Sequence, residues 1–194
     1  MSSSQAVSEN IRQRRTIKPK QFSDRPIDKA VISELLENAN WAPTHGMTEP
    51  WRFSIYTGDA RRRLAEFLAA TYKELTPPEN FKPNKYEGMS KNAMLAQAVL
   101  VIGMKRQEIE KISELDELMA VACAVQNIHL SATAHGLGAF WSTNVAAVSD
   151  KMRDFIGLGP KDRALGLFYL GYPDCDWPNC TRGSIEDKVR WIEE

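Results

Sequence analysis

The stretch ELDELMAVACAVQNIHLSATA, residues 114–134, predicts the longest helix of the chain. Small and apolar residues, among them Leu118, Cys123, Val125 and Ile128, occupy most of its surface. A helix that is apolar on nearly every side is normally buried. We therefore expect this helix to be covered almost all round, with Cys123 as a core filler. Such a helix in a chain of 194 residues is also what a large dimer interface would require.

Strands are predicted on both sides of this helix. Val99–Met104 and Leu165–Tyr172 are continuous apolar runs, which are typical of buried strands. Pro50–Tyr56 alternates large apolar with smaller or polar residues and also predicts a strand, and residues 139–143 begin another extended segment. The other helices are expected at residues 7–14, from a cap at Asp28 to Trp41, from Asp59 to Leu75, at residues 86–97, from a cap at Ser149 to Ile156, and from about Ser184.

The order of these elements lacks the regular alternation of strand and helix found in a doubly wound fold. It predicts an α+β domain in which a central sheet is flanked by helices. The length fits one domain over residues 1–194, and a hydrophobic content of 43% suffices for a core without disulfides or metal. We expect residues 76–84 to form an exposed proline-rich loop and residues 173–194 to form a C-terminal tail.

Charge and cysteine content argue against several classes of protein. Lys and Arg together number 25, as do Asp and Glu, and a formal net charge of zero is unlike that of a general nucleic-acid binder. The three cysteines show no zinc-like spacing and indicate a reducing, cytoplasmic compartment without a metal site. No apolar run reaches the roughly 18 residues of a membrane span, and the first residues lack the pattern of a secretion signal. We expect a cytoplasmic protein that acts on a small molecule.

The first candidate site is the basic run RQRRTIK, residues 12–18. A bare basic run is more often a solvated stretch at the end of a helix, where cations favour the dipole. The alternative is a phosphate site, because arginine presents a planar fork that matches phosphate oxygens, and Thr16 adds a hydroxyl. The sequence contains neither G-x-G-x-x-G nor a Walker motif, so side chains would have to hold a phosphorylated cofactor.

Two further segments place aromatic residues in connections. Residues 41–51 combine His45 with proline, glycine and tryptophan between a helix and a strand, and they form either a rigid turn or a binding loop. Residues 136–144 end the long helix with glycines. Such small residues also let a backbone N–H approach a flat ring, with Trp141 as an apolar wall.

Taken together and in this order, the segments resemble the nitroreductase family of FMN enzymes, and most of all its small, minimal branch. The matching motifs are RRT at residues 14–16, APTH at 42–45 running to PW at 50–51, GLG at 136–138 followed by WST at 141–143, and GLFYLGYP at 166–173. They cover nearly the whole chain. The resemblance implies a nitroreductase-like fold, with a mostly antiparallel or mixed sheet, and an intertwined homodimer.

The resemblance also implies a site for FMN. Its phosphate and ribityl chain would be held by Arg14, Arg15 and Thr16, and Lys18 would face the N1/O2 edge of the flavin. The implied set is completed by Trp41 and His45 from the partner subunit, by Trp141, Ser142 and Thr143 beside the ring and phosphate, and by Arg182 as a second phosphate-binding cation. The sequence departs from the family at Met47, where many members carry a polar ring contact, and at Gly183, which is often lysine.

The implied activity is a ping-pong reaction in which the flavin carries out the chemistry and no catalytic protein side chain is needed. NADH or NADPH would give hydride to the flavin, and a nitroaromatic, quinone or similar flat acceptor would then be reduced in the same cleft. Two alternatives remain at this point. One is a non-catalytic or regulatory flavin-binding dimer. The other is a hydrolase or transferase that uses Cys123 or a serine with His129 or His135. The spacing of Cys123 and His129 points these two side chains to different faces of a helix.

Overall fold

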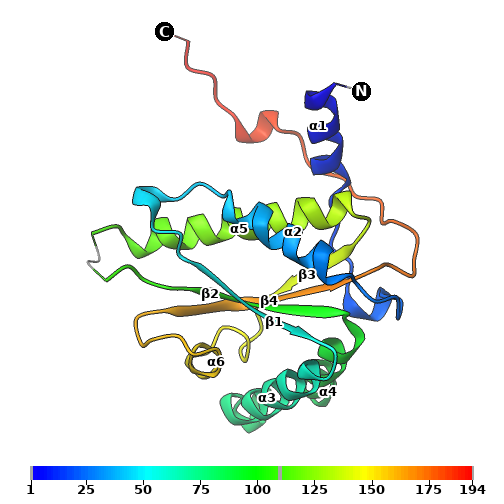
Figure 1. Ribbon diagram of the computed structural model, residues 1–194, viewed down its shortest axis with the longest axis vertical. Coiled ribbons are helices and arrows are strands. Elements are labelled where there is room, and N and C mark those ends of the chain that lie inside the picture. The colour runs from blue at the N-terminus through cyan, green and yellow to red at the C-terminus, as the bar shows by residue number, and fades with distance from the viewer. Residues whose placement is uncertain (1, 109–110, 194) are drawn as a thin grey trace.

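A computed structural model describes residues 2–108 and 111–193 (Figure 1). Met1 and Glu194, the ends of the expected domain, lie outside the described residues. In the described chain an antiparallel sheet has the order β1-β2-β4-β3. An isolated parallel bridge joins Thr16 to Ala139 at its β3 edge. The strands are β1 (Trp51–Thr57), β2 (Ala98–Met104), β3 (Gly138–Ser142) and β4 (Arg163–Gly171). The expected α+β architecture with a mostly antiparallel or mixed central sheet is therefore confirmed.

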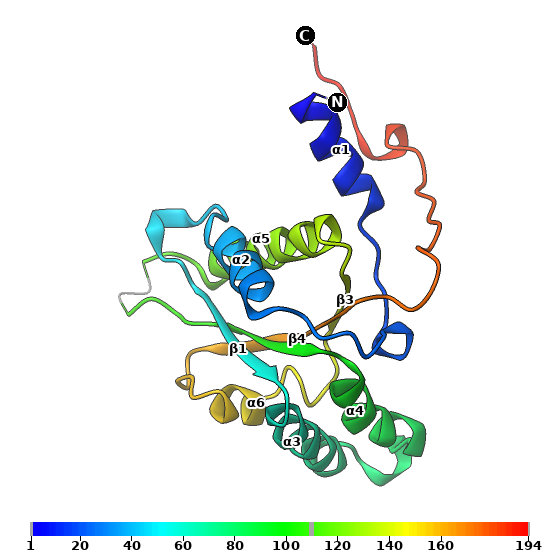
Figure 2. The same ribbon diagram turned by 45° about the vertical axis from the view of Figure 1, so that its right-hand side comes forward.

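Helices cover both faces of the sheet, as Figures 1 and 2 show. On one face lie α2 (Lys29–Asn40) and α5 (Glu114–Ala134). On the other lie α3 (Ala60–Leu75), α4 (Pro83–Leu95) and α6 (Asp150–Phe155), whereas α1 (Ser3–Gln13) projects from the body. Short 3-10 turns occur at Pro19–Gln21 (η1), His45–Met47 (η2), Pro78–Asn80 (η3) and Glu186–Lys188 (η4). Within the described residues, no helix has the length and apolar character needed to cross a membrane.

The helix boundaries follow local capping chemistry. The Asp28 carboxylate accepts a hydrogen bond from the Ala30 N–H at 2.8 Å, and the Ser149 hydroxyl accepts one from the Met152 N–H at 3.1 Å. Both caps satisfy a backbone donor that the first helical turn leaves unpaired. The long helix ends where Gly136 adopts a φ of 68°, a left-handed conformation that glycine reaches without strain. These starts and stops agree with the sequence-based expectations.

Burial on both faces explains the apolar strands. Every residue of β2 is buried. Leu100 and Ile102 pack in the core on the α2 and α5 side, whereas Val99 and Val101 pack on the α3 and α4 side. A strand that is covered on both sides has no polar face, so its sequence reads as a continuous apolar run. The same argument holds for most of β4.

The expectation that α5 is covered almost all round is wrong for the single chain. Leu115 and Met119 are 63% and 51% exposed, and Ala122, Cys123 and Gln126 are also exposed. Their spacing places them on one stripe of the helix. Cys123 is consequently not a core filler. The opposite side of α5 packs on the sheet and α2, so an apolar composition all round does not mean that one chain covers every side.

Two boundaries in the proline-rich region and the tail also differ from expectation. The helix expected at residues 86–97 is α4, which begins at Pro83 because proline fits the first helical position, where no N–H partner is needed. Phe81, inside the expected loop, packs against Tyr72 and Tyr86 with ring centroids 5.5 and 5.7 Å apart. The helix expected from Ser184 is a single 3-10 turn, η4.

The two ends of the chain lie side by side, away from the sheet (Figures 1 and 2). The Trp177 indole donates a hydrogen bond to the Gln13 carbonyl at 2.7 Å. The Arg15 Nε–H donates to the Pro178 carbonyl, also at 2.7 Å. These bonds fasten the first part of the C-terminal tail to the segment that follows α1.

Candidate functional site

Arginines from both ends of the chain line one cavity of about 450 Å³. Arg14 and Arg15 come from the segment after α1, and Arg182 comes from the tail. The lining residues of this arginine cavity are Ile11, Arg12, Arg14, Arg15, Cys180 and Arg182. The structure therefore brings together the arginines that the sequence assigned to a phosphate from two distant places.

Arg14 is the cation best placed to bind an anion here. Within the described chain, its half-buried guanidinium has no hydrogen-bond or ion-pair partner. Burial, together with the positive charges of Arg182 and Arg15, lowers the pKa of Arg14 below its ordinary value. Clustered cations repel one another unless an anion sits between them, so this arrangement favours a dianionic ligand such as a phosphate.

Arg15 has a different use from the one that the resemblance implies. Besides its bond to Pro178, its guanidinium donates to the carbonyls of Arg12 and Arg14, at 2.5 and 3.0 Å. The donors of Arg15 thus fix the backbone around the cavity, although its charge still contributes to the positive field. Arg182 donates to the Thr181 carbonyl at 2.9 Å and contacts the Cys180 thiol.

His129 of α5 binds the backbone of the arginine segment. Its Nε2 lies 3.0 Å from the Arg15 carbonyl, which can only accept, so Nε2 carries the proton. The ring packs edge-on against Phe168 at 5.3 Å between centroids. Burial, and to a smaller extent the charge of Arg14, lowers the pKa of His129 to about 4. The imidazole is therefore neutral near pH 7.

This buried histidine predicts an acid-sensitive fold. Protonation favours the unfolded chain, where histidine has a pKa of about 6.5, so stability is complete above that pH and falls as the pH approaches 4. This difference between the pKa values of His129 in the folded and unfolded chain corresponds to a loss of roughly 3 kcal/mol at most in the free energy of unfolding. Urea unfolding of wild type and His129→Gln between pH 7 and 4 measures it. The exposed His45 and the half-buried His135 remain in both proteins, and parallel pH profiles would contradict the prediction.

A second cavity, of about 550 Å³, opens between β3, β4 and α4. It contains two residues that the sequence assigned to the cofactor, Lys18 and Ser142. The lining residues of this Lys18 cavity are Lys18, Tyr72, Asn84, Lys85, Gly88, Met89, Asn92, Phe140, Ser142, Asn144, Val145 and Tyr169. Its size lies in the range of small-molecule and cofactor sites.

Sequence reasoning missed the contribution of α4 to this cavity. Asn84, Lys85 and Asn92 add amide groups and a second cation. Asn84 and Gly88, like Gly88 and Asn92, are four residues apart, so they lie on one side of the helix. This polar side of the helix was the signal in the sequence that could have indicated a contribution of α4 to a binding site. Asn84 also shows that the end of the expected loop 76–84 reaches the cavity.

One extended segment connects the two cavities. Thr16 forms the bridge to Ala139, and the Ile17 N–H donates to the Ala139 carbonyl at 3.0 Å, so this segment runs beside β3. At about 3.3 Å per extended residue, Arg14 and Lys18 are separated by roughly 13 Å. A ligand with an anionic group at one end and a flat ring at the other can therefore be held by both cavities together.

The side chains of the WST motif, residues 141–143, point in different directions because side chains alternate along β3. Ser142 faces the Lys18 cavity, whereas Trp141 packs with the core on the α5 side and donates from its indole to the Leu165 carbonyl at 3.0 Å. Gly166, with a φ of 125°, leaves room for this indole, because a Cβ there would lie 2.7 Å from Trp141 Nε1 and 2.5 Å from the Ser142 carbonyl oxygen. Thr143 is exposed and lines neither cavity.

His45 lies at the other end of α5, whereas Trp41 directly follows α2, where the Asn38 carbonyl accepts a hydrogen bond from Asn127 in the second half of α5. The His45 Nδ1 is 3.4 Å from the carboxylate of Asp116, in the first turn of α5. His129, under the arginine segment, is further along the same helix by a distance of about 20 Å, at 1.5 Å per residue. Trp41 is 80% exposed. Within one chain His45 is therefore remote from the arginine segment, and neither Trp41 nor His45 lines either cavity.

The turn that carries His45 is conformationally strained. Gly46, Met47 and Glu49 all have positive φ, at 60°, 56° and 44°. Positive φ is costly for residues with a Cβ and tends to occur at functional sites. Met47 is 76% exposed at the tip of this turn. The strain supports the view that residues 44–49 form a binding loop and not only a connection.

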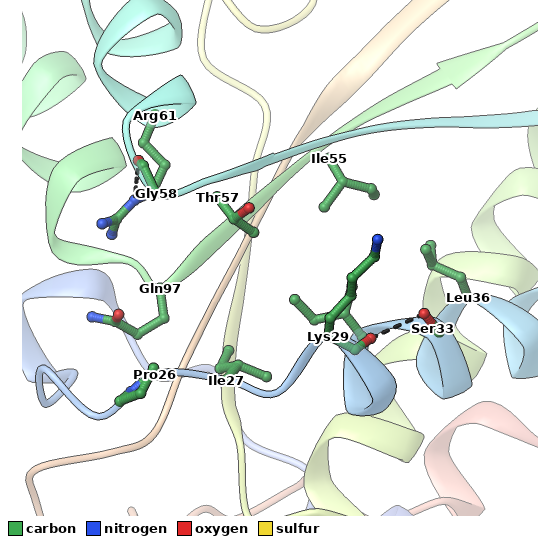
Figure 3. A pocket seen from close by; sticks show the side chains of 11 residues that line it. Pro26, Ile27, Lys29, Ser33, Leu36, Ile55, Thr57, Gly58, Arg61 and Gln97 are labelled. Atoms are coloured by element: carbon green, nitrogen blue, oxygen red, sulfur yellow. Dashed lines mark hydrogen bonds between the residues drawn. The ribbon is translucent and has the colours of Figure 1, made fainter.

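A further cavity of about 520 Å³ lies between α2 and the edge strand β1 (Figure 3). Ile27, Leu36 and Ile55 form an apolar wall, and the Lys29 side chain extends over it. Arg61 is bound to backbone carbonyls, including that of Gly58 at 3.0 Å. None of the site residues expected from the sequence lines this cavity, so it is separate from the candidate cofactor site.

The proposed hydrolase pair is not assembled. Cys123 is exposed on the outer stripe of α5, whereas His129 is buried under Arg15. The two side chains therefore occupy different faces of the helix, as their spacing predicts. This geometry removes the support for Cys123 as a nucleophile activated by His129.

Comparison with known proteins identifies the family of this chain. The model of the Nitroreductase family matches residues 11–172. This stretch includes most of the chain, and the protein therefore belongs to the nitroreductase family. The match covers the arginine segment, the η2 turn and all the strands of the described chain, and it leaves the whole tail, including Arg182, outside.

Individual relatives cover a similar or larger share of the chain. A protein of Bacillus subtilis (strain 168), "Putative NAD(P)H nitroreductase YfhC", is 28% identical over 165 residues, which are 84% of this chain and 82% of that protein. The solved nitroreductase-like family protein from Bacillus cereus has a TM-score of 0.82 at 25% identity, with 100% of both chains covered. The FMN-dependent nitroreductase NfnB from Mycobacterium smegmatis, in complex with NADPH, has a TM-score of 0.78 at 18% identity and covers 99% of this chain and 100% of its own.

Proposed function

We propose that the protein is an FMN-dependent NAD(P)H oxidoreductase that reduces nitroaromatics, quinones or similar flat acceptors. The observation that carries the proposal is the unpartnered Arg14 guanidinium, which faces Arg182 across one cavity while Lys18 lines the next. A cation cluster joined to a ring-sized cavity fits a phosphorylated planar cofactor. The names of the Bacillus subtilis and Mycobacterium smegmatis relatives support NAD(P)H as the donor and FMN as the cofactor.

Each residue has a physical role in this proposal. Arg14 and Arg182 bind the phosphate, with Thr16 beside them, and Arg15 and His129 hold the backbone that presents Arg14. Lys18 stabilises negative charge on the ring edge, which raises its reduction potential. FMN, when bound, supplies hydride transfer, first from the nicotinamide and then to the acceptor in the same cleft.

The proposed enzyme is a homodimer with shared sites. The exposed apolar stripe of α5, with Leu115 and Met119 at one end, is suited to a second copy of the chain. His45 adjoins that end of α5 and is far from the arginine cavity of its own chain, and the exposed Trp41 lines neither cavity, so a partner would supply both residues to the site. The three free cysteines support a reducing, cytoplasmic location.

An absorbance spectrum of the purified protein tests the function. We expect a yellow protein, or a colourless one that becomes yellow on addition of FMN, and anaerobic NADPH or NADH should bleach the colour. Addition of a quinone or nitroaromatic should restore it. Retained flavin without bleaching would instead indicate a passive flavin-binding protein. A protein that stays colourless with FMN would end the proposal, and a flavin-loaded monomer in sedimentation velocity would end the shared-site part of it.

A further inference from the structure

Tyr169 carries a hydroxyl in the buried, otherwise apolar part of β4, and its side chain lines the Lys18 cavity. It is 2% exposed and stacks on Phe140 with ring centroids 5.9 Å apart and planes at 15°. Phe140 is its cross-strand partner in β3, two residues before Ser142. Tyr169 therefore belongs to the floor of the cavity, on the face of the sheet that α4 covers.

The hydroxyl of Tyr169 has no hydrogen-bond partner in the described part of the chain. The hydroxyl is nevertheless not fully buried. Among the described residues, the one side-chain oxygen or nitrogen atom that is fully buried without a hydrogen-bond partner is Thr76 Oγ1, not the Tyr169 hydroxyl. The hydroxyl thus keeps its small remaining exposure toward the cavity. A buried tyrosine hydroxyl normally has a partner, so its absence points to a ligand atom at this position.

The ionisation of Tyr169 limits what the hydroxyl can do. Burial raises the pKa of Tyr169 above its ordinary value. At any working pH the group remains a neutral phenol that can donate one hydrogen bond. It does not serve as a base.

We propose that Tyr169 donates a hydrogen bond to a heteroatom of the flavin ring in the Lys18 cavity, a contact that rests on the FMN assignment above. The cofactor is favoured over the acceptor as the bonded group because Tyr169 lies in the floor. A resident ring lies against the floor and leaves its outer face for hydride donor and acceptor. A donor at the ring is worth more when the ring is reduced and more negative, so Tyr169 also raises the flavin reduction potential.

Tyr169→Phe tests the contact, since it removes one hydroxyl and keeps the stacked ring. We expect the dissociation constant of FMN to rise about fivefold, the order of one net hydrogen bond, together with a lower midpoint potential and a shifted flavin absorbance maximum. The unfolding midpoint of the apoprotein in urea should stay the same or rise, because the hydroxyl has no partner there.

Tyr56→Phe is the matched control. Tyr56 is buried on the same face of the sheet and lies in the same register row, paired with Val99, which pairs in turn with Tyr169. It does not line the cavity. Its substitution should leave the flavin spectrum, midpoint potential and FMN affinity unchanged.

The outcomes separate this contact from the proposed function. An unchanged potential, spectrum and FMN affinity in Tyr169→Phe would overturn the contact while leaving an FMN enzyme intact. A less stable apoprotein would overturn it too, because the hydroxyl would then have a structural partner. Wild type that fails to bind FMN would refute the proposed function itself, before any variant is compared.

Discussion

Replacement of Arg14 by alanine is expected to weaken FMN binding by roughly 10- to 100-fold. Hydrogen bonds to charged groups contribute about 1.5–3 kcal/mol, and each 1.4 kcal/mol is about tenfold in affinity. Arg14 lacks any other described partner, so its loss removes a ligand contact and breaks no internal bond. Titration of apoprotein with FMN, followed by the quenching of flavin fluorescence, measures the change.

Riboflavin provides the internal control for this variant, because it has the same ring and lacks the phosphate. Its affinity should be nearly equal in wild type and Arg14→Ala. Arg62→Ala, on the exposed side of α3, removes an equal charge away from both cavities and should not alter FMN affinity. If Arg14→Ala weakened riboflavin and FMN alike, the phosphate role of Arg14 would be wrong.

Replacement of Glu117 by alanine is expected to lower the free energy of unfolding by about 3–5 kcal/mol, the usual effect of leaving a buried charge without its partner. The Glu117 side chain is 0% exposed and contacts the guanidinium of Arg106, which is 10% exposed. Glu117 also accepts from the Gln107 N–H at 3.2 Å. The pair joins the end of β2 to the first turn of α5. Urea unfolding of the apoprotein is the measurement.

Two variants show whether burial causes this effect. Glu114→Ala removes another acid in the first turn of α5, whose bond to Arg163 at 2.8 Å is between half-exposed side chains. That variant should lose less than about 1 kcal/mol. A double replacement, Arg106→Met with Glu117→Leu, leaves no uncompensated charge and should recover much of the stability. Equal losses for Glu114→Ala and Glu117→Ala would contradict the argument.

The sequence contained most of the information about secondary structure and core. Caps such as Asp28 and Ser149 act through bonds within one helical turn, so their effect is local and readable. The apolar runs at β2 and β4 are equally local. The limits of α5 were right, but its exposure was not, because the sequence pattern does not say whether a neighbouring surface comes from the same chain.

The candidate site was predicted less completely, for reasons that particular residues show. Arg14 and Arg182 were placed together correctly, because the resemblance linked the two ends of the chain. Arg15 donates to the carbonyl of Pro178, which is far away in the sequence. No local sequence pattern reveals that these two residues lie side by side. Trp141 and Ser142 are adjacent in sequence, yet the strand pleat sends them to opposite faces of the sheet. The role of Tyr169 depends on an empty hydrogen-bonding position, and only packing shows that position.

The arginine cavity is built from the two extremes of the polypeptide, with Arg14 just after the first helix and Arg182 in the final tail. A nascent chain on the ribosome lacks half of this anion pocket until residue 182 has been synthesised. Under the proposed function, the flavin phosphate is therefore gripped by both arginines only after the segment that carries Arg182 has left the ribosome and packed beside Arg14.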